Sequence, residues 1–279
     1  MLDLDHFATH GYVRLPRAMD ADLVARWRDE AFARLRTSAS TQLVDSAPPA
    51  PPGAFASLDP DDPSTWRWRR ATLKGTKSAD LQDVAPAAWT ALTQLLGDRG
   101  LRRSTVTNYL ILSFPTPSHE RWPDRIRGLF RKKKPVGGGF HLDDPTDSMS
   151  LDGWRNAALL LVLYTDVLPG GGGTVLLPES ARMVARRLAA GGADFMDKDA
   201  ETRPLVEACT QRLQITGEAG DVFVMHPFLL HGTAPNRRST VRIVANPMLE
   251  AAATLNFRPG TSVASPLEEI TQAWAGSSA

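Results

Sequence analysis

The stretch GDVFVMHPFLLHGT, at residues 220–233, decides how this sequence is interpreted. Its four consecutive apolar residues, 222–225, follow a glycine and predict a buried strand. A turn containing proline then carries two histidines, His226 and His231, toward the interior. A single histidine in such a setting is more often a packed, hydrogen-bonded residue than a ligand. A second group is therefore needed before either histidine is given a function.

That second group lies in GGGFHLD, at residues 137–143. In an extended segment the side chains at positions i and i+2 point to the same face, so His141 and Asp143 can bind one ion together. Alone this pair is weak evidence, because such pairs are common at protein surfaces. Two histidines and one carboxylate, however, leave three positions of an octahedral ion open. This arrangement suits iron(II) that binds a bidentate oxo acid and then O2, whereas tetrahedral zinc needs less room.

An arginine in an apolar strand is the third feature. The stretch STVRIVA, at residues 239–245, places Arg242 among β-branched and small residues. Its planar guanidinium matches a carboxylate through two parallel hydrogen bonds, so it can anchor the far end of a dicarboxylate cosubstrate. The alternatives are a structural ion pair with a nearby Asp or Glu, or a position that faces solvent.

Composition limits the class of protein. The 279 residues are 42% hydrophobic and 23% charged, which is typical of one globular domain with a sizeable core. With 32 basic and 31 acidic residues, no global charge favours nucleic acid or an anionic membrane, so a small molecule is the expected partner. The longest apolar run, 157–164, is shorter than the ~20 residues of a membrane span. The lone Cys209 and the lack of a signal-peptide pattern in residues 1–10 predict a soluble, cytoplasmic protein.

The order of expected elements suggests a β sandwich or barrel with added helices. Helices are expected at residues 4–10, 20–35, 86–96, 181–190 and 266–274, and strands at 12–15, 104–114, 157–165, 173–177, 211–215, 221–225 and 240–245. The connection at 115–139 is long and basic, with Arg125, Arg127, Arg131 and Lys132 to Lys134. A solvated surface loop is the favoured interpretation. The alternative is a lid that brings positive charge to an anionic ligand.

The pattern of His141 and Asp143, His231-Gly232-Thr233 and Arg242 resembles the phytanoyl-CoA dioxygenase family of iron(II)- and 2-oxoglutarate-dependent oxygenases. In that family the distal ligand is the histidine before Gly-Ser or Gly-Thr, and the anchoring arginine follows eleven positions later. His231 and Arg242 have this spacing, so His231 is preferred to His226. Similarity extends over most of the chain, through FATHGYV at 7–13, LPGGGGTVLLPES at 168–180 and GD at 220–221.

The resemblance implies a mainly β fold with α, whose core is an eight-stranded double-stranded β-helix, a cupin-like jelly roll, with N-terminal helices packed on one sheet. A single oxygenase domain is expected over residues 1–279. It would comprise a largely helical part at 1–100, a core at 104–250 with an insertion at 115–139, and a tail with a short helix at 251–279. One further departure from the family is PESA at 178–181 in place of Pro-Gly-Ser-His.

The same resemblance implies the cofactors Fe(II), the cosubstrate 2-oxoglutarate, and O2. His141, Asp143 and His231 would be the catalytic metal ligands. Arg242 would hold the distal carboxylate of the cosubstrate together with Thr233, while Asn108 or Tyr109 would contact its other end.

Hydroxylation of an unactivated C–H bond of a small molecule, with release of succinate and CO2, is the expected reaction. Desaturation, epoxidation and ring formation remain open, but Asp143 disfavours halogenation because a halide needs that ligand position. The alternatives are a cupin-type isomerase or lyase without 2-oxoglutarate, and a non-catalytic small-molecule binding protein.

The basic insertion, together with Arg67, Arg69 and Arg70, suggests an anionic or carrier-linked substrate. An apolar wall of the substrate site is suggested by Trp66, Trp68, Trp122 and Trp154. The sequence does not fix the oligomeric state.

Overall fold

Two facing antiparallel sheets form the core of the chain. The computed structural model describes residues 2–37, 56–66, 70–102, 104–115, 139–143 and 149–277. The larger sheet has seven strands in the order β1-β9-β6-β11-β5-β2, with β12 also paired to β6, and the smaller has the order β10-β7-β8. A mainly β fold with a jelly-roll core is thereby confirmed.

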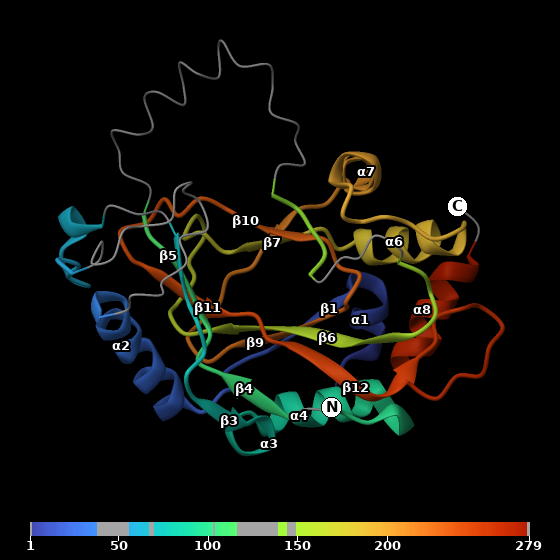
Figure 1. Cartoon of the computed structure of the whole chain (residues 1–279), viewed down its shortest axis with the longest axis horizontal. Coiled ribbons are helices and arrows are strands. Elements are labelled where there is room, and N and C mark those ends of the chain that lie inside the picture. The colour runs from blue at the N-terminus through green and yellow to red at the C-terminus, as the bar shows by residue number, and fades with distance from the viewer. Residues whose placement is uncertain are drawn as a thin grey trace, which may run out of the picture.

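The larger sheet contains β1 (Tyr12–Leu15), β2 (Arg70–Leu73), β5 (Leu110–Ser113), β6 (Trp154–Leu163), β9 (Val222–Met225), β11 (Arg242–Ala245) and β12 (Met248–Leu255). The smaller contains β7 (Thr174–Leu176), β8 (Leu213–Gln214) and β10 (His231–Thr233), and β3 (Ser78–Asp80) pairs with β4 (Thr105–Thr107). The helices are α1 (Leu4–His10), α2 (Ala21–Thr37), α3 (Leu81–Val84), α4 (Pro86–Leu96), α6 (Ser180–Ala189), α7 (Arg203–Ala208) and α8 (Pro266–Gly276). In Figure 1, β7 and β10 lie on one side of the larger sheet, and α3 and α4 lie on the other.

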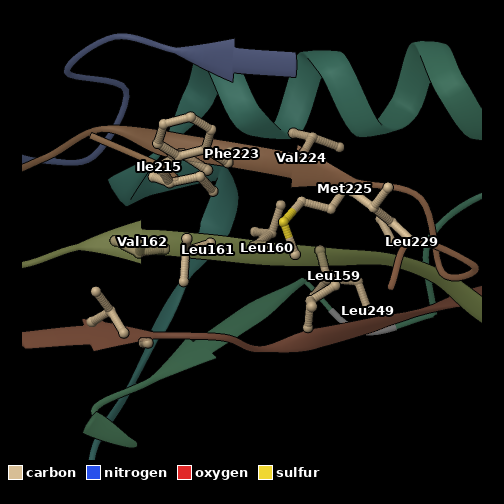
Figure 2. Packing of buried hydrophobic residues seen from close by; sticks show 14 of the residues in the cluster. Leu159, Leu160, Leu161, Val162, Ile215, Phe223, Val224, Met225, Leu229 and Leu249 are labelled. Atoms are coloured by element: carbon tan, nitrogen blue, oxygen red, sulfur yellow. The ribbon is translucent and has the colours of Figure 1, made fainter. Parts of the chain in front are cut away.

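Strand β6 is central, and from Ala157 onward it is buried on both faces, which explains its apolar sequence from that residue to Leu163. Leu159 and Leu161 lie opposite Met225 and Phe223 of β9 in the antiparallel register, and Figure 2 shows these side chains packed together. The alternate residues of β6 point the other way. Tyr164 directly follows β6 and stacks its ring on that of Trp27 in α2, at a distance of 6.1 Å between ring centroids. A helical layer therefore excludes water from the face that an antiparallel sheet often leaves wet.

The N-terminal part contains α1 to α4 and also contributes strands to the larger sheet. The expected strand β1 pairs with β9, and β2, which was not expected, pairs with β5. The C-terminal boundary also differs, because β12 continues to Leu255 and pairs with β6, so part of the expected tail belongs to the core. Alanines at positions 251–253 weakened the strand signal there. The expected strand at 104–114 is two strands, β4 and β5.

Several sequence features lie outside the described residues, namely 116–138 of the insertion with its arginines and lysines, Arg67, Trp68, Arg69 and Trp122. Trp66 contacts Phe114 at 6.1 Å between ring centroids, and Trp154 contacts Phe228 at 4.7 Å. These two tryptophans thus pack in separate parts of the core. Within the described ranges, no helix has the length and apolar character needed to cross a membrane.

Candidate functional site

Two histidines and one carboxylate from distant parts of the chain converge in the structure. One ligand atom from each of His141, Asp143 and His231 lies within 4.8 Å of the others. The Nε2 atom of His141 is 3.4 Å from Oδ1 of Asp143, and Nε2 of His231 is 3.6 Å from Oδ2. Three Lewis-basic atoms facing one another in this way fit a cation between them, and the donor set suits a transition metal.

Backbone pairing brings the two histidines together. The N–H of His141 donates to the carbonyl of His231 at 3.0 Å, and the N–H of His231 donates back at 3.1 Å. Gly232 permits this close approach, because a Cβ there would lie 3.0 Å from the carbonyl oxygen of Gly139. His231 also lies at the start of β10, whose other edge pairs with β7. The sheet register therefore sets the separation of the ligands.

Each histidine ring is oriented by a carbonyl of its own segment. Nδ1 of His141 is 3.0 Å from the oxygen of Gly139, and Nδ1 of His231 is 3.0 Å from the oxygen of Leu229. Because a carbonyl only accepts hydrogen bonds, Nδ1 is the donor in both contacts. Nε2, the atom that faces Asp143, is therefore the nitrogen through which each ring can bind a metal.

The carboxylate of Asp143 is held ionised. Burial alone would raise its pKa, but hydrogen bonds and positive charge from His141 and His231 outweigh burial and hold the pKa well below its usual range. Nδ2 of Asn246 also lies 3.4 Å from Oδ2 of Asp143. An ionised carboxylate with an oriented amide beside it is the environment expected of a metal ligand.

Arg242 is buried a short distance along the same strand from Asn246, and only 3% of it is exposed. Its Nη2 donates to Oγ of Ser113 at 3.0 Å, and its Nη1 lies 3.5 Å from Oγ1 of Thr174. Burial is the main cause that lowers the pKa of Arg242 to about 9, and the nearby positive charge of Arg70 is the second cause. No ion pair to a described carboxylate neutralises this guanidinium. The alternative of a structural ion pair with Asp or Glu therefore finds no support among the residues that the structure describes.

The other expected cosubstrate contacts lie at different distances from this arginine. Thr233 is exposed and pairs with Thr174 in the register of β10 and β7, which places it one strand away. Asn108 is buried, and its Oδ1 accepts hydrogen bonds from the N–H groups of Thr76 and Lys77 at 2.7 and 2.9 Å. Its side chain thus secures the link between β2 and β3, and contact with a cosubstrate remains a prediction.

Tyr109 directly precedes β5 and is 39% exposed, so its side chain is accessible to a ligand. Its role likewise remains a prediction.

His226 is part of the core. Its Nδ1 accepts from the N–H of Phe228 at 3.0 Å, its Nε2 lies 2.9 Å from Oγ1 of Thr271, and its ring is 4.9 Å from that of Trp274. Burial lowers the pKa of His226 to about 3, so the ring stays neutral. Both ring nitrogens are engaged away from the metal-binding cluster, which agrees with the preference for His231.

Four polar contacts at the site were not expected from the sequence. They are made by Asn246, Ser113, Thr174 and, as a neighbour of Arg242, Arg70. Asn246 follows Arg242 by four positions, an even spacing that puts both on one face of an extended segment. The other contacts depend on strand pairing and had no local signal.

Comparisons with known proteins agree with this site. The family model described as Phytanoyl-CoA dioxygenase (PhyH) matches residues 7–244. Among curated proteins, none matches the chain significantly. Among solved structures, the chain is similar to the non-heme alpha ketoglutarate dependent carbocyclase SnoK from nogalamycin biosynthesis, with a TM-score of 0.55 and 15% identity over 91% of this chain and 84% of that one.

A second solved structure with the same fold is EvdMO1, with a TM-score of 0.51 and 16% identity. The match covers 89% of this chain and 49% of EvdMO1. At such identities the structural likeness establishes the shared fold, while the family model covers most of the sequence, including all three clustered residues and Arg242. The chain therefore belongs to the phytanoyl-CoA dioxygenase family, a family of iron(II)- and 2-oxoglutarate-dependent oxygenases.

Proposed function

We propose that this chain is a dioxygenase that hydroxylates an unactivated C–H bond of a small molecule, using Fe(II), 2-oxoglutarate and O2. In the balanced reaction, R–H, 2-oxoglutarate and O2 give R–OH, succinate and CO2. The observation that carries the proposal is the convergence of His141, Asp143 and His231, together with the buried Arg242 on β11 of the larger sheet. An ion site and an anion site of this kind suit one ligand that is both a chelating oxo acid and a carboxylate.

The distance between the two parts of the site supports this assignment. Asn246, which contacts Asp143, lies four residues beyond Arg242, a separation of roughly 13 Å if the chain stays extended. This span is of the order that a small dicarboxylate and the two side chains would occupy together. Thr174 and Thr233, on adjacent strands, present hydroxyls near the Arg242 end.

Each protein group has a defined task in the proposed reaction. His141, Asp143 and His231 would hold the metal, and Arg242 would fix the cosubstrate so that its oxo acid end faces the metal. When bound, iron and 2-oxoglutarate supply the activation of O2 and the electrons for its reduction. The protein keeps the carboxylate of Asp143 ionised and fixes Nδ1 of both histidines on backbone carbonyls, so Nε2 of each ring is turned toward the metal position.

The rival functions differ in their need for Arg242. A cupin-type isomerase or lyase would use the same three ligands without 2-oxoglutarate, and a binding protein would need neither. A buried guanidinium without a described carboxylate partner is costly in both cases, and it favours the oxygenase. The substrate is proposed to be a small molecule, anionic or carrier-linked. A cytoplasmic location is proposed as well, supported by the free, buried thiol of Cys209.

The decisive experiment measures succinate formed from 2-oxoglutarate under air with added Fe(II), across a panel of candidate small molecules. Wild type is compared with His141→Ala and Arg242→Ala, and with two matched controls outside the site, His6→Ala and Arg155→Ala. We expect wild-type turnover that depends on a panel compound. His141→Ala should abolish this turnover, and Arg242→Ala should show it only at high 2-oxoglutarate. Both controls should behave as wild type.

A binding measurement separates the rivals even before a substrate is found. Anaerobic addition of Fe(II) and 2-oxoglutarate should give a weak visible charge-transfer band that requires both components. Metal binding without this band would favour an isomerase or lyase. If neither metal nor 2-oxoglutarate bound to the wild-type protein, the enzymatic proposal would be abandoned for a metal-free binding protein.

A further inference from the structure

Two arginines flank one serine across three neighbouring strands. Arg242 of β11 pairs with Ser113 of β5, and Ser113 pairs in turn with Arg70 of β2. Directly opposed residues of antiparallel strands point to the same face, and neighbouring strands lie about 4.8 Å apart. The register therefore places the side chains of both arginines on one face, on either side of the small side chain of Ser113.

Hydrogen bonding turns the buried arginine toward its counterpart. Nη2 of Arg242 donates to Oγ of Ser113 at 3.0 Å, so its guanidinium leans over β5, in the direction of β2. The Nε atoms of both Arg70 and Arg242 are buried and have no hydrogen-bond partner in the described part of the chain. Each arginine thus keeps at least one donor unused at this place.

The charges of this row are not balanced by the described residues. No ion pair is found for either Arg70 or Arg242 in the described ranges, although eight other arginines there form one. Arg70 is close enough for its charge to contribute to the lowered pKa of Arg242. Two like charges beside each other with unused donors disfavour the unliganded state and favour any state that contains an anion.

We propose that Arg70 is the second arm of a carboxylate clamp, in which the distal carboxylate of 2-oxoglutarate binds over Ser113 between Arg242 and Arg70. The inference rests on the proposed function and adds a binding residue to it. A carboxylate offers two oxygens and about four lone-pair sites, so it accepts hydrogen bonds from two guanidinium forks at once. Such a clamp would make the enzyme select 2-oxo acids that carry a second carboxylate.

The test compares two ligands that differ only at the clamped end. Calorimetric titrations on the Mn(II)-loaded protein would measure the affinity for 2-oxoglutarate and for 2-oxopentanoate, which has a methyl group in place of the distal carboxylate. The variants are Arg70→Gln, Arg70→Lys and Arg242→Gln, with Arg155→Gln as the control at an exposed position of β6. Mn(II) affinity and the unfolding midpoint are measured for each variant, so that a folding defect is recognised.

We expect Arg70→Gln to weaken 2-oxoglutarate binding by roughly tenfold to a hundredfold, the usual effect of losing a hydrogen bond between charged groups. Its effect on 2-oxopentanoate should stay within about threefold, because that ligand has nothing for Arg70 to hold. Arg70→Lys should fall between wild type and Arg70→Gln, since it keeps the charge but loses the fork. Arg155→Gln should change neither affinity.

Two results would overturn the clamp while leaving the proposed function intact. One is wild-type affinity for 2-oxoglutarate in Arg70→Gln when Arg242→Gln is impaired, and the other is equal loss for both ligands in Arg70→Gln. If Arg70→Gln did not fold, Arg70→Lys would decide by the same ratio of the two affinities. Failure of the wild-type protein to bind 2-oxoglutarate at all would instead refute the proposed function, and the clamp with it.

Discussion

The buried carboxylate of Asp221 offers a quantitative test of how the core is held together. Only 1% of its side chain is exposed. Its oxygens accept hydrogen bonds from Nε and Nη2 of Arg14 at 3.0 and 2.6 Å, from the N–H of Arg17 at 2.8 Å, and from the N–H of Glu218 at 3.0 Å. One side chain therefore joins β1 to the turn that precedes β9.

The cost of Asp221→Ala follows from what each donor loses. The N–H groups of Arg17 and Glu218 would lose their acceptor, at about 1–3 kcal/mol each. The side chain of Arg14 is 44% exposed, so water can replace the carboxylate there and the loss is only about 0.5–1 kcal/mol. The sum is about 2.5–7 kcal/mol, a range that contains the usual cost of removing one partner of a buried ion pair, about 3–5 kcal/mol.

Urea unfolding followed by circular dichroism measures this difference directly. Arg28→Ala is the control, because it removes an ion pair whose two side chains are 41% and 67% exposed; it should cost about 1 kcal/mol or less. The Mn(II) affinity of folded Asp221→Ala should equal that of wild type, since Asp221 is not in the candidate site. If Asp221→Ala lowered the free energy of unfolding no more than Arg28→Ala does, the assigned role of the backbone donors would be refuted.

Three further outcomes follow from the described contacts. Asn246→Ala should weaken Mn(II) binding by about tenfold, because the amide beside Asp143 is lost, and unchanged affinity in calorimetry would contradict that support. Gly232→Ala should also weaken Mn(II) binding by about tenfold, as its Cβ would lie 3.0 Å from the carbonyl oxygen of Gly139 and push the ligand segments apart; wild-type affinity would show that the segments can yield. For Glu268, burial raises the pKa, but hydrogen bonds from an arginine and two backbone N–H groups outweigh it and lower the pKa. The ionised Glu268 therefore stabilises the fold above its unfolded pKa of about 4.3, and this stabilisation is lost as pH falls. Glu268→Gln should accordingly lower the free energy of unfolding most at neutral pH. A difference between the two proteins that did not change with pH would rule this out.

Local sequence predicted much of the fold because the relevant signals are short-range. The helix at residues 4–10 and the strand at 12–15 have the expected bounds, and α1 begins at Asp3, whose carboxylate accepts from the N–H of His6. The apolar run of β6 likewise indicated a buried strand. By contrast, β2 has only four residues and β12 is rich in alanine, so their positions in the larger sheet were decided by pairing with β5 and β6.

The ligand triad was also accessible from sequence, for two separate reasons. Strand geometry alone puts His141 and Asp143 on one face, and the family resemblance selected His231 over His226. The structure brings the three within 4.8 Å of one another and buries His226 elsewhere. Their service as iron ligands remains a prediction for the metal titrations to test.

The sequence by itself determined the residue types of the site, the apolar strands and the family. Only the tertiary structure decided which side chains meet across strands. Arg70 and Arg242 are separated by most of the chain, and they become neighbours because each pairs with Ser113. Register is a property of paired strands, and a shift by one residue would turn these side chains to the opposite face. No pattern within either segment alone could have shown that two arginines share one space.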